Sequence, residues 1–339
     1  MASAIQNIFF ESIRKNLPQN LSLAEALSDA LGISSDSAYR RIRGDTMLSL
    51  EEIQALSNYF KISVDQVLSL NSNTTTFSGN FIDGAKFSLE HYLQGMIDEL
   101  MYVNSFDSKE MIYFAQDVPI FHYLMFPELA AFKFFIWIKT LLPEQPGNES
   151  DNSFEAILEV LLPKSKKLTQ LYAGIPGVEI LSPEITATTQ WQIEYFRDAK
   201  FYRNEKEITV LYDKLDEMIY HMERQAEEGK KFLPGTKVLA ESAPYKLYIN
   251  DFVIGDNTVL SKTDESYICY INHNTINFFS TKNVSFIDYT ARFLDNVIRK
   301  SILISSVGEK ERSIFFNNTH RNINKCRQNF IKSAGAIDY

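Results

Sequence analysis

The sequence predicts a mainly α-helical protein, with a short five-helix module at the N-terminus and a helical body that ends in an α+β portion containing a small antiparallel sheet. Three observations predict this fold class. Apolar residues recur at spacings of three and four through most of the chain, as amphipathic helices require. Small polar residues at 71–80 form a linker between module and body. Four runs rich in β-branched and aromatic residues lie between 245 and 281.

Capping residues and glycines mark the first two helices of the module. The first helix, at 4–17, ends before a proline. Its predicted inward stripe comprises Ile5, Ile8, Phe9, Ser12, Ile13 and Leu17. The second helix, at 23–31, follows Ser22, has Glu25 in place for a capping box, and ends at Gly32.

Three more short helices complete the module. Their predicted ranges are 36–43, 50–60 and 63–68. Ser34 or Ser35 can cap the third helix, which ends at Gly44, and Ser49 can cap the fourth. The third helix is expected to turn only Ala38, Ile42 and Tyr39 inward. The inward residues predicted for the fourth helix are Leu50, Ile53, Leu56 and Phe60.

The joint between the second and third helices is the most informative part of the module. An apolar helix, a tight turn at Gly32 and a polar helix with three arginines form the layout of a helix-turn-helix. With the Arg-Gly end at 43–44 and the run Ile-Ser-Val-Asp-Gln-Val-Leu at 62–68, residues 5–70 resemble the Cro/phage-repressor (XRE) family. The resemblance implies a lambda-repressor-like domain over residues 1–70 that binds double-stranded DNA. The sequence departs from the family pattern at Arg41, Ile42 and the longer 45–48 connection.

The resemblance also assigns candidate DNA-binding residues. It places a recognition helix, about residues 35–43, in the major groove. The implied base-reading residues are Ser35, Asp36, Tyr39 and Arg40, and the implied phosphate contacts are Ser34 and Arg43. The full candidate set is Ser34, Ser35, Asp36, Ser37, Tyr39, Arg40, Arg41 and Arg43, in which Arg41 could serve either surface. Arginine suits base reading because it can donate two hydrogen bonds to guanine.

Composition limits what the rest of the chain can do. The chain has 339 residues and a net charge of −9, so a body that coats nucleic acid non-specifically is not expected and any DNA contact must be local. Cys269 and Cys326 have no CxxC partner, which favours a reducing cytoplasm over a disulfide framework. The N-terminus lacks the pattern of a secretory signal, and charges interrupt the most apolar stretch, 121–142. We therefore expect a cytoplasmic protein without membrane contact.

The body is predicted to contain a helical domain at 81–204 and an α+β sensory or dimerisation domain at 205–339. Expected helices span 87–102, 127–142, 153–171, 188–202, 285–301 and 309–325, and expected strands span 245–249, 258–260, 267–271 and 275–279. Residues 110–115 fit a strand or a short helix. Aromatic residues between 121 and 137 could line a small-molecule pocket, with His122 and Glu128 as its polar groups, but core packing is favoured.

The most regular helical spacing lies in the second half of the body. Five apolar residues repeat at intervals of three and four, like the a/d seam of about two heptads. They are Ile208, Leu211, Leu215, Met218 and Met222. This seam is the dimerisation candidate, and packing within its own domain is the alternative for so short a repeat.

No motif for catalysis, metal binding or cofactor binding is recognised. The five histidines form no HxxxH, HxH or HExxH pattern, and neither GxxxxGK[ST] nor GxGxxG occurs. We therefore expect no enzyme activity, metal or cofactor. The favoured function is a bacterial-type transcription regulator that binds DNA as a homodimer and responds to an unknown small effector. Two alternatives stay open: a protein-interaction module, antitoxin-like or scaffolding, that uses the same helical head, and an enzyme body with a regulatory head.

Overall fold

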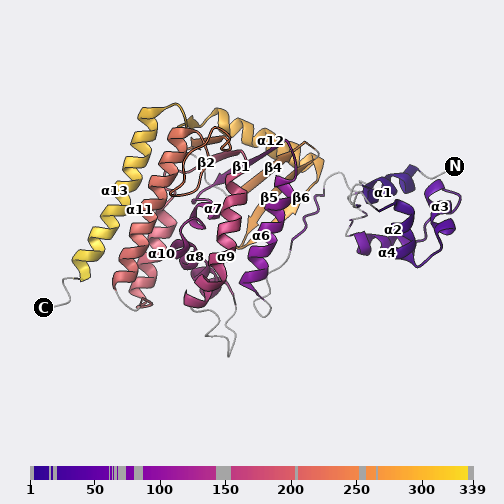
Figure 1. Cartoon of the computed structure of the whole chain (residues 1–339), viewed down its shortest axis with the longest axis horizontal. Helices are drawn as coiled ribbons and strands as arrows, with labels where there is room; N and C mark the ends of the chain where they lie inside the picture. Colours follow the sequence, from indigo (N-terminus) through magenta and orange to yellow (C-terminus); the bar gives the residue numbers. More distant parts are fainter. Residues whose placement is uncertain are drawn as a thin grey trace. The chain divides into compact units, whose positions relative to one another are not determined.

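The chain folds into two compact units, Met1–Phe77 and Ser78–Tyr339, which we call the head and the body. Both are drawn in Figure 1, which shows the computed structural model. The structure describes residues 4–14, 17, 21–60, 62, 64, 67, 74–79, 87–142, 154–202, 205–251, 257–264 and 266–334. A mainly helical fold with an N-terminal helical head is confirmed. Among the described residues, no helix is long and apolar enough to cross a membrane.

The head contains the first four predicted helices. They are α1 (Ala4–Arg14), α2 (Leu23–Leu31), α3 (Ser35–Arg43) and α4 (Leu50–Phe60). Apart from Val64 and Val67, the expected fifth helix at 63–68 lies outside the described residues. The head core is built from all four helices and is centred on Phe9, Leu27 and Leu56.

Two details of the predicted head core are wrong. The inward face of α1 comprises Gln6, Phe9, Phe10 and Ile13, while Ile5 and Ile8 are 58% and 52% exposed. The side-chain amide of Gln6 makes hydrogen bonds to backbone groups inside the head. Gln6 therefore lies on the buried face of α1, and Ile5 and Ile8 lie outside it. Leu50, expected inside, is 81% exposed at the first position of α4.

The body is built on a seven-stranded mixed sheet in the order β6-β5-β4-β1-β2-β3-β7. The strands are β1 (Lys109–Ala115), β2 (Gly177–Leu181), β3 (Tyr245–Ile249), β4 (Thr258–Thr263), β5 (Tyr267–His273), β6 (Asn277–Thr281) and β7 (Ile302–Leu303). Strands β1, β2 and β3 are parallel, and the other pairings are antiparallel. The parallel strands need crossover connections, which the helices between them provide.

Helices cover both faces of this sheet. They are α6 (Leu89–Asn104), α7 (Ile120–Tyr123), α8 (Pro127–Leu141), α9 (Phe154–Ala173), α10 (Ala187–Asp198), α11 (Glu205–Glu228), α12 (Val284–Arg299) and α13 (Glu309–Ala334). One face, which includes Tyr113, packs against every helix except α12 in the larger core. The other face, which includes Ile112, packs against α12. Figure 1 shows α11 and α13 side by side, and they are in contact.

The sheet is larger than the small antiparallel sheet predicted for 245–281. Strands β4, β5 and β6 form the expected antiparallel part, but β1 and β2 join the sheet from within the expected helical domain. The expected division of the body at residue 204 therefore does not match the structure, in which Ser78–Tyr339 is one compact unit. All five residues of β2 are buried, so this strand lacks the alternation that reveals a strand exposed on one face.

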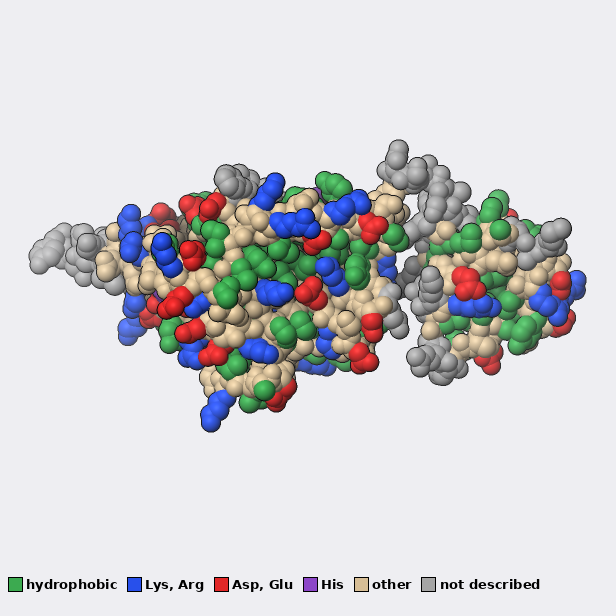
Figure 2. All heavy atoms as spheres, turned by 90° about the horizontal axis from the view of Figure 1, so that it is seen from above, with side chains coloured by type: hydrophobic (Ala, Val, Ile, Leu, Met, Phe, Trp, Pro, Cys, Tyr) green, Lys and Arg blue, Asp and Glu red, His purple; other side chains and the backbone are tan. Residues whose placement is uncertain are grey.

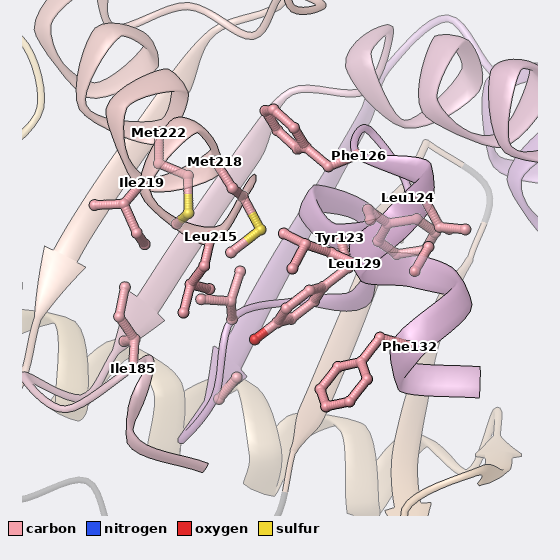
Figure 3. Packing of buried hydrophobic residues seen from close by; sticks show 14 of the residues in the cluster. Tyr123, Leu124, Phe126, Leu129, Phe132, Ile185, Leu215, Met218, Ile219 and Met222 are labelled. Atoms are coloured by element: carbon pink, nitrogen blue, oxygen red, sulfur yellow. The ribbon is translucent and has the colours of Figure 1, made fainter. Parts of the chain in front are cut away.

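The predicted dimer seam lies inside the body. Ile208, Leu211, Leu215, Met218 and Met222 are each at most 4% exposed. Figure 3 shows Leu215, Met218 and Met222 packed among buried side chains such as Tyr123 and Leu129. A helix that packs on its own domain has the same apolar period as a coiled-coil helix, so the spacing could not distinguish a core helix from a dimer helix. The aromatic residues between 121 and 137 belong to the same core, as favoured.

Candidate functional site

Local capping interactions fix the joint between α2 and α3. Ser22 and Glu25 form the predicted capping box at the start of α2. Gly32 ends α2 with φ 65°, a left-handed conformation that glycine adopts without a Cβ clash. The hydroxyl of Ser34 then accepts the backbone N–H of Ser37 and starts α3, which ends at Gly44 with φ 80°. The chain thus folds into two short helices joined by a tight turn.

The outer side of α3 presents polar and basic side chains to solvent. Ala38 is fully buried and holds the helix on the head core. Six of the eight candidate residues are exposed: Ser34, Ser35, Asp36, Tyr39, Arg40 and Arg43. We call these six the recognition surface. Ser37 is half-buried, and Arg43 also contacts Asp45 through Nε at 3.1 Å. Tyr39, expected in part to face inward, is 52% exposed.

Arg41 points back into the head. Its Nε lies 3.1 Å from Oε1 of Glu52 on α4, and its Nη1 donates to the carbonyl of Ser37 at 3.1 Å. The two charged side chains are only 16% and 20% exposed, and the hydrogen bond from Arg41 lowers the pKa of Glu52. Arg41 therefore ties the recognition helix to α4, which accounts for an arginine at this departure from the family pattern.

Gln6 supports the same helix from α1 and was not among the sequence candidates. Its Nε2 donates to the carbonyls of Arg41, at 2.8 Å, and Thr46, at 3.1 Å. Its Oε1 accepts the backbone N–H of Leu48 at 3.0 Å. Gln6 is 5% exposed, so it anchors the end of α3 and the connection to α4 from inside the head. Its spacing from Phe9, Phe10 and Ile13 is the signal that could have placed it inward.

These features define a helix-turn-helix domain with an exposed recognition helix. Residues 11–67 match the helix-turn-helix family model. The head is therefore a helix-turn-helix domain of the Cro/C1 type, as the resemblance implied, and this domain marks the chain as a DNA-binding regulator. No curated protein and no solved structure matches the chain.

The body shows no comparable charged surface in the view of Figure 2. On that face, Lys and Arg side chains are interspersed with Asp and Glu and with apolar side chains. A phosphate backbone is bound by clustered positive charge, which this face lacks. The recognition surface on α3 is therefore the better candidate for nucleic-acid contact.

The most concentrated polar chemistry of the body is buried around Glu179 on β2. Nε2 of His122 lies 2.9 Å and 3.0 Å from its two carboxylate oxygens. The hydroxyls of Tyr172 and Tyr245 donate to the same carboxylate at 2.5 Å and 2.8 Å. Glu179 has no exposed surface, and the other three residues are 1% exposed. One buried carboxylate thus joins α7, α9, β2 and β3.

The body buries two lysines in opposite ways. Lys133 donates to Asp117 and to Gln192, each at 3.0 Å. Lys231 has no hydrogen-bond acceptor among the described residues, and its Nζ instead lies 3.5 Å from the centre of the Tyr172 ring. That ring belongs to the tyrosine that donates to Glu179, so Tyr172 lies between the buried lysine and the buried carboxylate group's hydrogen-bond network.

Burial and charge set the pKa values in this cluster. Burial alone would raise the pKa of Glu179, but the charge and hydrogen bond of His122 and the charge of Lys231 lower it to about 2. Burial lowers the pKa of Lys231 to about 8, against an opposing effect of Glu179. Gly177 makes room for this lysine, since a Cβ there would lie 2.5 Å from Lys231 Nζ. The cluster places charge where the surrounding core is apolar.

We predict that Lys231→Met stabilises the body. In the unfolded chain this lysine has a pKa near 10.5 and in the folded chain about 8, so the folded state binds fewer protons between these values and stability rises with pH across them. Below pH 8 the unmodified protein carries the full cost of burying a charged lysine. The methionine variant avoids this cost and should be more stable by about 3 kcal/mol at pH 7. Urea unfolding at pH 7 and at pH 10.5 measures this. The gain should largely vanish at the higher pH, and Lys167→Met, on an exposed face of α9, should change neither value.

Proposed function

We propose that the protein is a sequence-specific transcriptional regulator whose α3 lies in the major groove of DNA. One observation carries the proposal: the helix-turn-helix exposes Arg40 and Arg43 while Arg41 is held inside the head by Glu52. A merely solvated helix face would not require this separation. The exposed residues lie on the helix that reads bases in this class of domain.

In this function each exposed residue has a definite role. Arg40 reads a base edge, with Tyr39, Asp36 and Ser35 beside it at the start and middle of α3. Arg43 and Ser34 contact phosphates at the two ends of the helix and fix its register on the duplex. Arg41 is withdrawn from the set proposed on sequence, because its guanidinium is committed to Glu52.

The proposal includes a homodimer that acts in the cytoplasm. A single small head buries too little surface for tight specific binding, and two recognition helices about one DNA turn apart read an inverted repeat. The body supplies the dimer surface and responds to a small effector. This surface must lie outside the stripe formed by Ile208, Leu211, Leu215, Met218 and Met222, which is buried.

Two substitutions separate the proposed roles on DNA. Arg40→Ala should cost about 1–3 kcal/mol on the preferred duplex and little on others, because it removes base contacts. Arg43→Ala should weaken all duplexes alike and lower the salt slope by about one. Fluorescence anisotropy across a salt series measures both, with Arg14→Ala on α1 as the control, since this exposed arginine pairs with Glu11 outside the helix-turn-helix joint. Equal losses on every duplex from both α3 variants would remove Arg40 from base reading.

A further inference from the structure

The end of the linker, at Ser78, pairs with the edge of the body sheet. The backbone N–H of Ser78 donates to the carbonyl of Ser280 at 2.7 Å, and the N–H of Ser280 donates to the carbonyl of Ser78 at 2.8 Å. This is an antiparallel β-bridge. Ser280 lies on β6, the strand at one edge of the seven-stranded sheet. The contact falls within the compact body, which begins at Ser78.

Gly79 allows this contact because it has no side chain. A Cβ at this position would lie 2.3 Å from Cδ1 and 2.8 Å from Cε1 of Phe279, and 3.1 Å from the carbonyl oxygen of Phe278. The absence of a side chain therefore lets the linker backbone lie directly against the aromatic ring of the edge strand. By contrast, a Cβ at Gly95 on α6 would meet nothing within 4 Å.

We propose that the outer edge of β6 is a strand-docking surface whose occupant is this chain's own linker, and that docking sets the reach between head and body. An edge strand presents unpaired N–H and C=O groups that readily accept another strand. Ser78 satisfies both backbone groups of Ser280, and the glycine that follows permits the close approach. The linker therefore covers this edge at Ser280. Ser78 becomes the fixed end of the connecting segment to the head, which we call the tether.

Docking reduces the maximum length of the tether by nearly half. From Val67 to Ser78 the chain spans eleven residues, which limits its length to about 40 Å. If the linker left the sheet, the tether would extend to the start of α6 at Leu89 and reach about 75 Å. This consequence for DNA rests on the proposed function. Half-sites in such operators lie about 34 Å apart or at multiples of this distance, so docking would narrow the spacings that two heads can bridge.

Hydrogen exchange on the full-length protein tests docking without DNA. Ser78→Pro removes the N–H that donates to Ser280, and Gly79→Val places atoms where the Phe279 ring lies. Both variants should speed exchange of the Ser280 amide about tenfold or more, because its acceptor is displaced. Gly95→Ala is the matched glycine control and should leave this amide unchanged. Rapid exchange in the unmodified protein, or equal exchange in all four proteins, would overturn the proposal.

Two further readouts separate docking from its consequences. Protection of the Ser280 amide that falls on dilution would assign the docked linker to a second copy of the chain and overturn the assignment to the same chain. Selection of duplexes by the two undocked variants should enrich a wider range of half-site spacings than the unmodified protein does, and the same range would overturn the role in reach. If neither the unmodified protein nor the variants enrich any duplex, and the Ser280 amide of the unmodified protein is still protected, the proposed function fails and docking stands.

Discussion

Replacing Gln6 with leucine should lower the free energy of unfolding of the head by about 3 kcal/mol, because three backbone groups lose their partner at once. The carbonyls of Arg41 and Thr46 and the N–H of Leu48 would face an apolar side chain instead of an amide. Leucine is close to glutamine in size, so the loss comes from hydrogen bonds and not from a cavity. The end of α3 would lose its support from α1.

Hydrogen exchange of the α3 amides in the full-length protein measures this effect. A loss of about 3 kcal/mol corresponds to exchange about a hundredfold faster through local unfolding of the head. Gln54→Leu is the control, because this glutamine lies on an exposed position of α4. DNA affinity of the Gln6 variant should fall as well, since the recognition helix is no longer fixed. Unchanged protection of α3 would show that Gln6 does not anchor it.

Replacing Glu179 with leucine should destabilise the body by about 3–5 kcal/mol, because the buried groups that hydrogen-bond to its carboxylate would be left without a partner. His122, Tyr172 and Tyr245 would lose their acceptor, and Lys231 would lose the nearby negative charge. The double variant Glu179→Leu and Lys231→Met should be destabilised less than Glu179→Leu alone. In the double variant no buried lysine is left without a nearby negative charge.

Urea unfolding followed by tryptophan fluorescence suits this test, since both tryptophans of the chain, Trp137 and Trp191, lie in the body. Glu179→Gln provides the matched comparison because it keeps the shape and part of the hydrogen bonding. The order of stability should be unmodified protein, then Glu179→Gln, then Glu179→Leu, with the double variant Glu179→Leu and Lys231→Met above the single leucine variant. A leucine variant as stable as the unmodified protein would contradict the role assigned to this cluster.

The head could be predicted closely because its signals are local. Ser22, Glu25 and Gly32 fix the ends of α2 through contacts within a few residues, and Ser34 and Gly44 do the same for α3. The family resemblance of these residues then indicated the helix-turn-helix domain and double-stranded DNA as its class of partner. What the sequence could not resolve in the head depends on contacts between helices. Arg41 is charged, and only its partner Glu52 on α4 shows that it points inward. The spacing of Gln6 places it on the buried face of α1, but only its hydrogen bonds show that it supports α3.

The body was predicted less well because its organisation depends on long-range pairing. The individual helices and the strands β4 to β6 follow local patterns, but the pairing of β1 with β2 joins residues more than sixty positions apart. A strand buried on both faces has no alternation, so β2 was not among the predicted strands. The stripe on α11 has a period that a core helix and an interface helix share, so burial alone decides between them.

Selection of bound duplexes from a random double-stranded library tests the central claim most directly. The full-length protein at near-physiological salt should enrich an inverted repeat, and Arg40→Ala should lose preference at one position in each half-site. Enrichment of an inverted repeat would establish a dimeric reader of DNA sequence and provide its operator. Failure to enrich any sequence, together with binding that is equal for all duplexes, would contradict sequence-specific recognition by α3.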